Sequence, residues 1–222
     1  MVLSRHQSCH LDGFHVAVGD KSVNCASKAG RATVPDAARE QRRIDDHDQS
    51  NMKSHQLMAA MPPAMATDVL EFAFAADKKL YRAALDAVAQ ARKLRTVFLE
   101  RQPRTERNAS MVSFLSRPSL EVVSDNLLRA WLLKKNTAVL TDFLDALKIP
   151  HEKGVVEDLP ASVDDANLSA AIEALLQKHP PELVAIYLHA FSDMNDARWP
   201  NLETRLAEDT RLALGGGGAK TA

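Results

Sequence analysis

Glycine is scarce through most of this chain. Gly154 is the only glycine between residues 31 and 214 of the 222-residue sequence. Tight β-hairpin turns depend on glycine or asparagine for their positive backbone angles. A βαβ domain shows β-branched strand segments that alternate with helices. Neither pattern occurs in this sequence, which therefore favours an all-α fold.

Cysteine and long apolar runs are also scarce. Only Cys9 and Cys25 are present, so the rest of the chain cannot form a disulfide, which fits a reducing compartment. No apolar run approaches the roughly 20 residues needed to span a membrane. The short apolar run at residues 14–19 is not followed by the small-residue cleavage site of a secretory signal. We therefore expect a cytoplasmic protein without a membrane partner.

The first 64 residues differ in composition from the rest. They hold one of the eleven aromatic residues, Phe14, but five of the eight histidines, and their aliphatic residues follow neither a helical nor a strand period. Two interpretations remain open for residues 1–64: a disordered extension, or a leader that precedes the true start of translation. Besides Met1, the candidate starts are Met52, Met58, Met61 and Met65.

The clearest helical pattern lies between residues 120 and 150. Apolar residues recur at the spacing of one helix face, at Leu120, Val123, Leu127, Ala130 and Trp131. A second set follows at Leu140, Phe143, Leu144 and Leu147 and stops before Pro150. The break at residues 136–137, with Thr137 as an N-cap, predicts a tight hairpin of two helices. We expect Trp131 to be buried in that hairpin.

Further helical patterns cover 68–100, with a break near 75–79, and then 162–179, 181–194 and 200–212. They predict a compact helical bundle or a short helical array of about six helices. This single domain would span 65–214 and end in a flexible glycine-rich tail at 215–222. A weak similarity between 131–144 and 187–206 leaves a two-fold repeat open.

One segment is strongly basic, although the net charge of the chain is only −1. Residues 92–107 contain two carboxylates, Glu100 and Glu106, and six cations: Arg92, Lys93, Arg95, Arg101, Arg104 and Arg107. Such a cluster suits phosphate or nucleic-acid contact. It equally suits the end of a helix, where cations offset the negative end of the macrodipole. No RNA-binding motif or zinc finger accompanies the cluster.

Two groups of residues have the chemistry of metal ligands but not the spacing. In the loop after Pro150 these are His151, Glu152, Glu157 and Asp158; near the N-terminus they are Cys9, His10, His15 and Cys25. The first group lacks an H-E-x-x-H motif, and the second lacks the paired elements of a zinc site. We expect no cofactor and treat the loop residues as weak metal candidates.

Three classes of function remain. A non-catalytic helical module that binds another protein, or a copy of itself, is favoured because every strong pattern is a packing pattern. A nucleic-acid or phosphate binder would use the basic segment. A metal-dependent enzyme would use the loop at 151–158.

Overall fold

The computed structural model describes residues 52–195 and 198–214. It confirms the all-α prediction: the described residues form helices and no β-strand, apart from one isolated bridge between Glu152 and Val155. No helix among them is long and apolar enough to cross a membrane. The predicted N-terminal extension up to residue 51, the Cys9–Cys25 region and the tail at 215–222 lie outside the described residues.

The described residues form more helices than the predicted six. The α-helices are α2 (Ser54–Ala60), α3 (Pro63–Ala76), α4 (Lys78–Ala91), α5 (Thr96–Glu100), α6 (Arg104–Leu115), α7 (Glu121–Ala130), α8 (Thr137–Ala146), α9 (Asp165–Lys178), α10 (Pro181–Met194) and α11 (Pro200–Glu208). A 3₁₀ turn, η1 (Pro118–Leu120), precedes α7, and a π-helical turn, η2 (Trp131–Lys135), follows it.

The helical pattern at 68–100 is broken where the sequence predicts. Asp77 separates α3 from α4 with backbone angles of φ −141° and ψ 77°, and its side chain accepts a hydrogen bond from Leu80 N. This is an N-cap, which satisfies a backbone donor at the start of α4. A second break at Lys93 and the proline at 103 divide the rest of the basic segment between α5 and α6.

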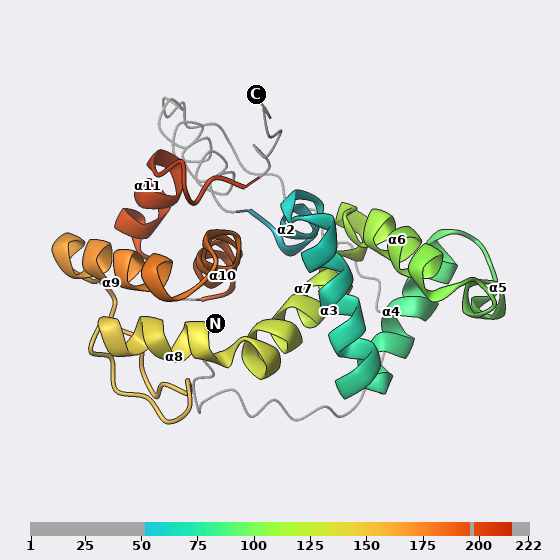
Figure 1. The fold of residues 1–222 in the computed structure, drawn as a ribbon, viewed down its shortest axis with the longest axis horizontal. Helices are drawn as coiled ribbons and strands as arrows, with labels where there is room; N and C mark the ends of the chain where they lie inside the picture. Colours follow the sequence, from blue (N-terminus) through green and yellow to red (C-terminus); the bar gives the residue numbers. More distant parts are fainter. Residues whose placement is uncertain (1–51, 196–197, 215–222) are drawn as a thin grey trace, which may run out of the picture. The chain divides into compact units, whose positions relative to one another are not determined.

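The predicted hairpin at residues 136–137 is wrong. Figure 1 shows α8 following α7 end to end through η2, and the two helices do not pack side by side. Asn136 N donates to Trp131 O at 3.1 Å, the i to i+5 bond of a π turn, and the Thr137 hydroxyl donates to Leu133 O. Thr137 is therefore the first residue of α8 and not its N-cap. These bonds keep the chain helical and only bend it.

The bent α7–η2–α8 segment has different partners at its two ends. The α7 end packs against α2, α3 and α4, whereas α8 packs against α9 and α10. Buried apolar side chains from both ends belong to one continuous core. Since α10 and α11 do pack against each other, unlike α7 and α8, the arrangement does not support the two-fold repeat.

Aromatic rings fill the core beneath α8 and α10. Phe143 lies edge-on to Tyr187 and to Phe191, with ring centroids 5.7 and 5.3 Å apart. Trp199 packs against Phe191 at 5.2 Å, and its indole N–H donates to Pro160 O at 2.9 Å. Such pairs add to the stabilisation that ring burial provides, and the indole bond fixes the loop before α9.

The domain begins earlier than the predicted boundary at Met65. In α2, Ser54, Leu57 and Met58 are buried, and the helix packs against α6, α7 and α10. A carboxylate from α7 caps it: Glu121 accepts hydrogen bonds from Ser54 N and His55 N, both at 2.9 Å. Residues 52–64 are therefore part of the fold. A seven-residue helix is too short to show a clear period in the sequence.

Glu121 gives the fold a predictable dependence on pH. Burial raises the pKa of Glu121, but the hydrogen bonds from His55 and Ser54 outweigh it, so the pKa is lowered. A carboxyl group with a lowered folded pKa stabilises the fold above its unfolded pKa of about 4.3, and this stability is lost as the pH falls through the folded pKa. We expect Glu121→Gln to flatten the loss of stability between about pH 5 and 3. Urea midpoints measured against pH test this, with Glu208→Gln, an exposed residue of α11, as the control that keeps the wild-type slope.

Candidate binding site at the basic segment

The six predicted cations are spread over the C-terminal end of α4, the turns on either side of α5, and α6. Arg92 ends α4, and Lys93 follows in the left-handed conformation with φ 54°. Its N–H donates to Gln90 O, and Leu94 N donates to Ala89 O, both at 2.9 Å. This is the hydrogen-bond pattern that closes a helix C-terminus. The chain turns there, so the cations do not form one continuous helical face.

Three of the cations are bound to the protein's own fold. Arg92 donates to Ser110 Oγ at 2.7 Å and lies over the Phe114 ring. Arg104 forms an ion pair with Glu71 and lies over Phe74. Arg107 donates to Tyr81 Oη at 2.9 Å and to Glu100 O at 3.1 Å. These three arginines tie α6 to neighbouring helices, which is a structural role.

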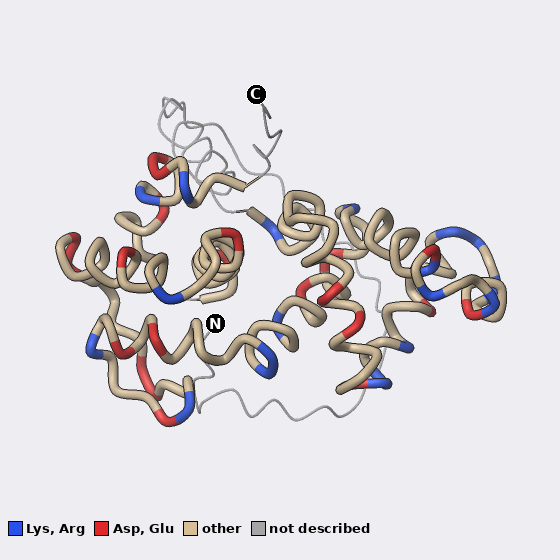
Figure 2. The backbone as a smooth tube through the Cα atoms, in the orientation of Figure 1, with Lys and Arg blue, Asp and Glu red and all other residues tan. Residues whose placement is uncertain are grey.

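The other three cations face solvent. Lys93, Arg95 and Arg101 are exposed, and their side chains make no hydrogen bond or ion pair with any described residue. Three apolar side chains lie between them in the sequence and are exposed as well: Leu94 by 39%, Val97 by 42% and Phe98 by 54%. We call residues 93–101 the α5 tip. Figure 2 shows the blue segments of this tip gathered around α5.

A chain of hydrogen bonds connects the tip to α3, α4 and α6, and it reaches the tip where Arg107 donates to Glu100 O. Tyr81 Oη, which accepts from Arg107, donates to Asn108 Oδ1 at 3.3 Å. Asn108 Nδ2 donates to Glu71 Oε1 at 2.7 Å, and Arg104 Nε donates to the same oxygen at 2.8 Å. Asn108 is buried, and a buried amide needs such partners. An asparagine on the same helix face as Met111 and Leu115 was the signal in the sequence for this network.

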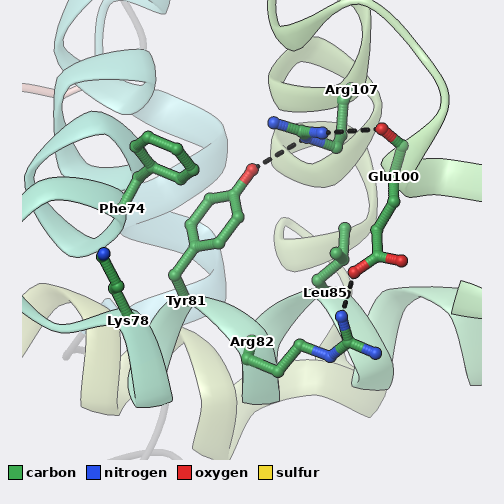
Figure 3. Close-up of a pocket in the computed structure, with 7 residues that line it drawn as sticks. All are labelled: Phe74, Lys78, Tyr81, Arg82, Leu85, Glu100 and Arg107. Atoms are coloured by element: carbon green, nitrogen blue, oxygen red, sulfur yellow. Dashed lines mark hydrogen bonds and ion pairs between the residues drawn. The ribbon is translucent and has the colours of Figure 1, made fainter. Parts of the chain in front are cut away.

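A small hollow lies where α3, α4, α5 and α6 meet. Its volume is about 230 Å³, and its walls are Phe74, Lys78, Tyr81, Arg82, Leu85, Glu100 and Arg107. Figure 3 shows Tyr81 in the middle, with Arg107 at its hydroxyl end and Phe74 and Lys78 on the other side. An ion pair between Arg82 and Glu100 closes the remaining edge.

A larger hollow of about 470 Å³ lies where α3, η2 and α10 meet. It is lined by Pro62, Ala64, Met65, Asp68, Trp131, Asn136, Pro180, Glu182 and Leu183. The Asp68 carboxylate accepts hydrogen bonds from the Trp131 indole at 2.9 Å and from Lys135 at 2.5 Å. Both oxygens are thus already engaged by the fold.

The loop at 151–158 does not assemble a metal site. His151 Nδ1 accepts a hydrogen bond from Gly154 N at 3.1 Å, and its Nε2 lies 3.1 Å from Asp145 Oδ1. Both ring nitrogens therefore have a partner, one in the loop and one in α8. Across 52–195 and 198–214 no group of three or more His, Cys, Asp or Glu is placed to hold a metal, so Glu152, Glu157 and Asp158 do not join His151 in one.

His189, on α10, is buried. It is 8% exposed, and its Nε2 lies 3.2 Å from Leu212 O. Burial lowers the pKa of His189, more than the contact with Leu212 raises it. The neutral ring donates to the carbonyl and holds the segment after α11 against α10, which is a structural role.

Comparisons of the chain with family models, with curated proteins and with solved structures find no match.

Proposed function

We propose that this protein is a non-catalytic helical interaction module that binds an acidic, partly apolar segment of another protein through the α5 tip. The observation that carries the proposal is the composition of this tip. Six large apolar side chains are exposed among the described residues, and three of these lie within the tip. Three cations that have no carboxylate partner among the described residues lie close to them in the sequence.

The balance of residue types favours a protein partner over nucleic acid. Phosphate contacts are made by cations and polar groups, and three exposed cations would supply few of them. Leucine, valine and phenylalanine contribute little to such contacts. Protein interfaces are enriched in aromatic residues and arginine, which are the residue types of Phe98, Arg95 and Arg101.

The same balance disfavours a membrane surface. A single myristoyl chain gives only marginal, reversible membrane binding. The fold already covers about half of the Leu94, Val97 and Phe98 side chains. The apolar surface that they have left to insert into a membrane is therefore smaller than that of a myristoyl chain. An acidic protein segment instead offers the tip both apolar contacts and carboxylates for its free cations.

The test uses a synthetic amphipathic peptide with leucine and phenylalanine on one helical face and glutamate on the other. Its binding to the full chain is followed by fluorescence anisotropy at low and at physiological salt. Val97→Ser combined with Phe98→Ser is expected to weaken binding about tenfold, because truncating a central apolar anchor costs about 1–2 kcal/mol. Lys93→Gln, Arg95→Gln and Arg101→Gln together should weaken binding and flatten its salt dependence. Arg104 and Arg107 are left intact because they hold the fold.

The control is Val122→Ser on α7, whose valine is 72% exposed and lies outside the tip; it should leave binding unchanged. Duplex DNA, single-stranded RNA and vesicles with anionic lipid are tested beside the peptide. If only nucleic acid binds, and the Val97 and Phe98 changes have no effect, the protein is a phosphate binder. Binding to vesicles alone, or to none of the probes, also overturns the proposal.

A further inference from the structure

The hollow in Figure 3 has an apolar wall built from three side chains of α3 and α4. Phe74 and Tyr81 meet edge to face, with ring centroids 5.2 Å apart and an angle of 80°. Leu85 lies one helical turn beyond Tyr81 and is buried. Phe74 is 38% exposed, although large aromatic side chains contribute most to stability when they are buried. A ligand in the hollow would cover part of this ring.

The polar part of the wall carries more positive than negative charge. Its three cations are Lys78, Arg82 and Arg107, and its one carboxylate is Glu100. Arg82 is neutralised by ion pairs with Glu100 and, outside the hollow, with Asp86. Lys78 and Arg107 have no carboxylate partner among the described residues. The hollow therefore has two positive charges that the fold does not neutralise.

Arg107 is held in place before any ligand arrives. Its Nε donates to Tyr81 Oη and one of its terminal nitrogens donates to Glu100 O. A guanidinium has five N–H donors, so three remain. Because Tyr81 is itself fixed by Asn108, little side-chain freedom is left to lose on binding. A fixed guanidinium with spare donors is suited to a carboxylate.

We propose that this hollow binds a small organic carboxylate, whose apolar body packs on Phe74, Tyr81 and Leu85 and whose charge is met by Arg107 and Lys78. The apolar wall selects against inorganic anions, which have no apolar body. A volume of about 230 Å³ is several times the roughly 30 Å³ that one water occupies, which suits a small organic acid. Phenylacetate is of this size. A free acid and the C-terminal carboxylate of a peptide ending in phenylalanine share this chemistry. The inference does not depend on peptide binding at the α5 tip, although Glu100 of that tip forms part of the wall.

The first measurement is a titration of the full chain with phenylacetate, followed by isothermal calorimetry and by amide chemical shifts. The expected dissociation constant is about 0.1–10 mM, as for a ligand of few atoms. Phenylacetamide, which has the same shape without the charge, should bind at least about tenfold more weakly, because it leaves the cations unpaired.

The matched variants are Lys78→Gln and Lys79→Gln. Both residues are exposed on the first turn of α4, but only Lys78 lines the hollow. Lys78→Gln should weaken phenylacetate binding about five- to tenfold, whereas Lys79→Gln should leave it nearly unchanged. Phe74→Ser removes the exposed ring and should weaken phenylacetate and phenylacetamide alike.

Each outcome decides for or against the site. Equal binding of acid and amide, equal effects of the two lysine variants, or no binding of phenylacetate in the millimolar range overturns the proposal. A peptide ending in phenylalanine with a free carboxylate identifies the source of the ligand. If it binds more tightly than phenylacetate and its amidated form does not, the site takes a peptide terminus. If it binds no better, the site takes a free acid.

Discussion

A chain that begins at Met65 is expected to be much less stable than a chain that begins at Asn51. The shorter chain lacks α2 and Met61 directly after it; Leu57, Met58 and Met61 are 0, 1 and 4% exposed. Burying each such side chain contributes roughly 1.5–3 kcal/mol, or about 5–9 kcal/mol for the three. A domain has only about 5–15 kcal/mol of net stability. Urea melts of the two chains should therefore show a large drop in midpoint or no cooperative transition.

Point variants in the full chain separate packing from chain length. Leu57→Ala should cost about 2–5 kcal/mol because it leaves a cavity. Ala59→Ser, at an exposed position of the same helix, should change the free energy of unfolding by less than about 0.5 kcal/mol. Equal midpoints for the chains beginning at Met65 and Asn51 would mean that α2 adds nothing to the fold.

Trp131→Ala should cost about 3–5 kcal/mol of folding stability, the usual range for removing a core aromatic residue. The indole is 2% exposed, and its N–H donates to Asp68 Oδ2 at 2.9 Å. It begins the π-helical turn that links α7 to α8. Its loss therefore removes a packed ring at the bend and a donor to Asp68.

Trp131→Phe distinguishes the two contributions. Phenylalanine keeps much of the apolar volume but cannot donate to Asp68, so its cost should be smaller than that of alanine. Both variants are compared by denaturant melts at one pH. A loss below about 1 kcal/mol for Trp131→Ala would contradict a core role and would assign the indole to a contact surface.

The spacing of apolar residues along the chain predicted the helices that are formed by neighbouring residues alone. The helices at 165–178 and 181–194 match apolar residues that recur every three to four positions. The π-helical turn could not be predicted in this way, because Asn136 and Thr137 change the hydrogen bonds without reversing the chain. The burial of α2 could not be predicted either, since it depends on α6, α7 and α10, which lie far along the sequence.

The candidate site shows the same limit. The sequence identified all six cations at 92–107 but not which of them the fold would use. Arg104 pairs with Glu71, which lies 33 positions away, and Arg107 with Tyr81, 26 positions away. Only a folded chain brings these groups together. The sequence likewise does not show which apolar residues of the α5 tip are exposed. In the fold Leu99 is buried, whereas its neighbour Phe98 is exposed.

The ion pair between Lys53 and Asp193 has a consequence for the order of events during synthesis. These residues lie 140 positions apart and their charged groups are 3.0 Å apart in the fold. At about 5–20 residues per second, a ribosome needs about 7–28 s to travel from one to the other. For that time α2 is complete while α10, one of the helices it packs on, does not yet exist. The apolar face of α2 has no partner until α6, η1 and α7 have been synthesised, and then only these until α10 follows. Slow translation would therefore lengthen the period in which this helix is open to chaperones and proteases.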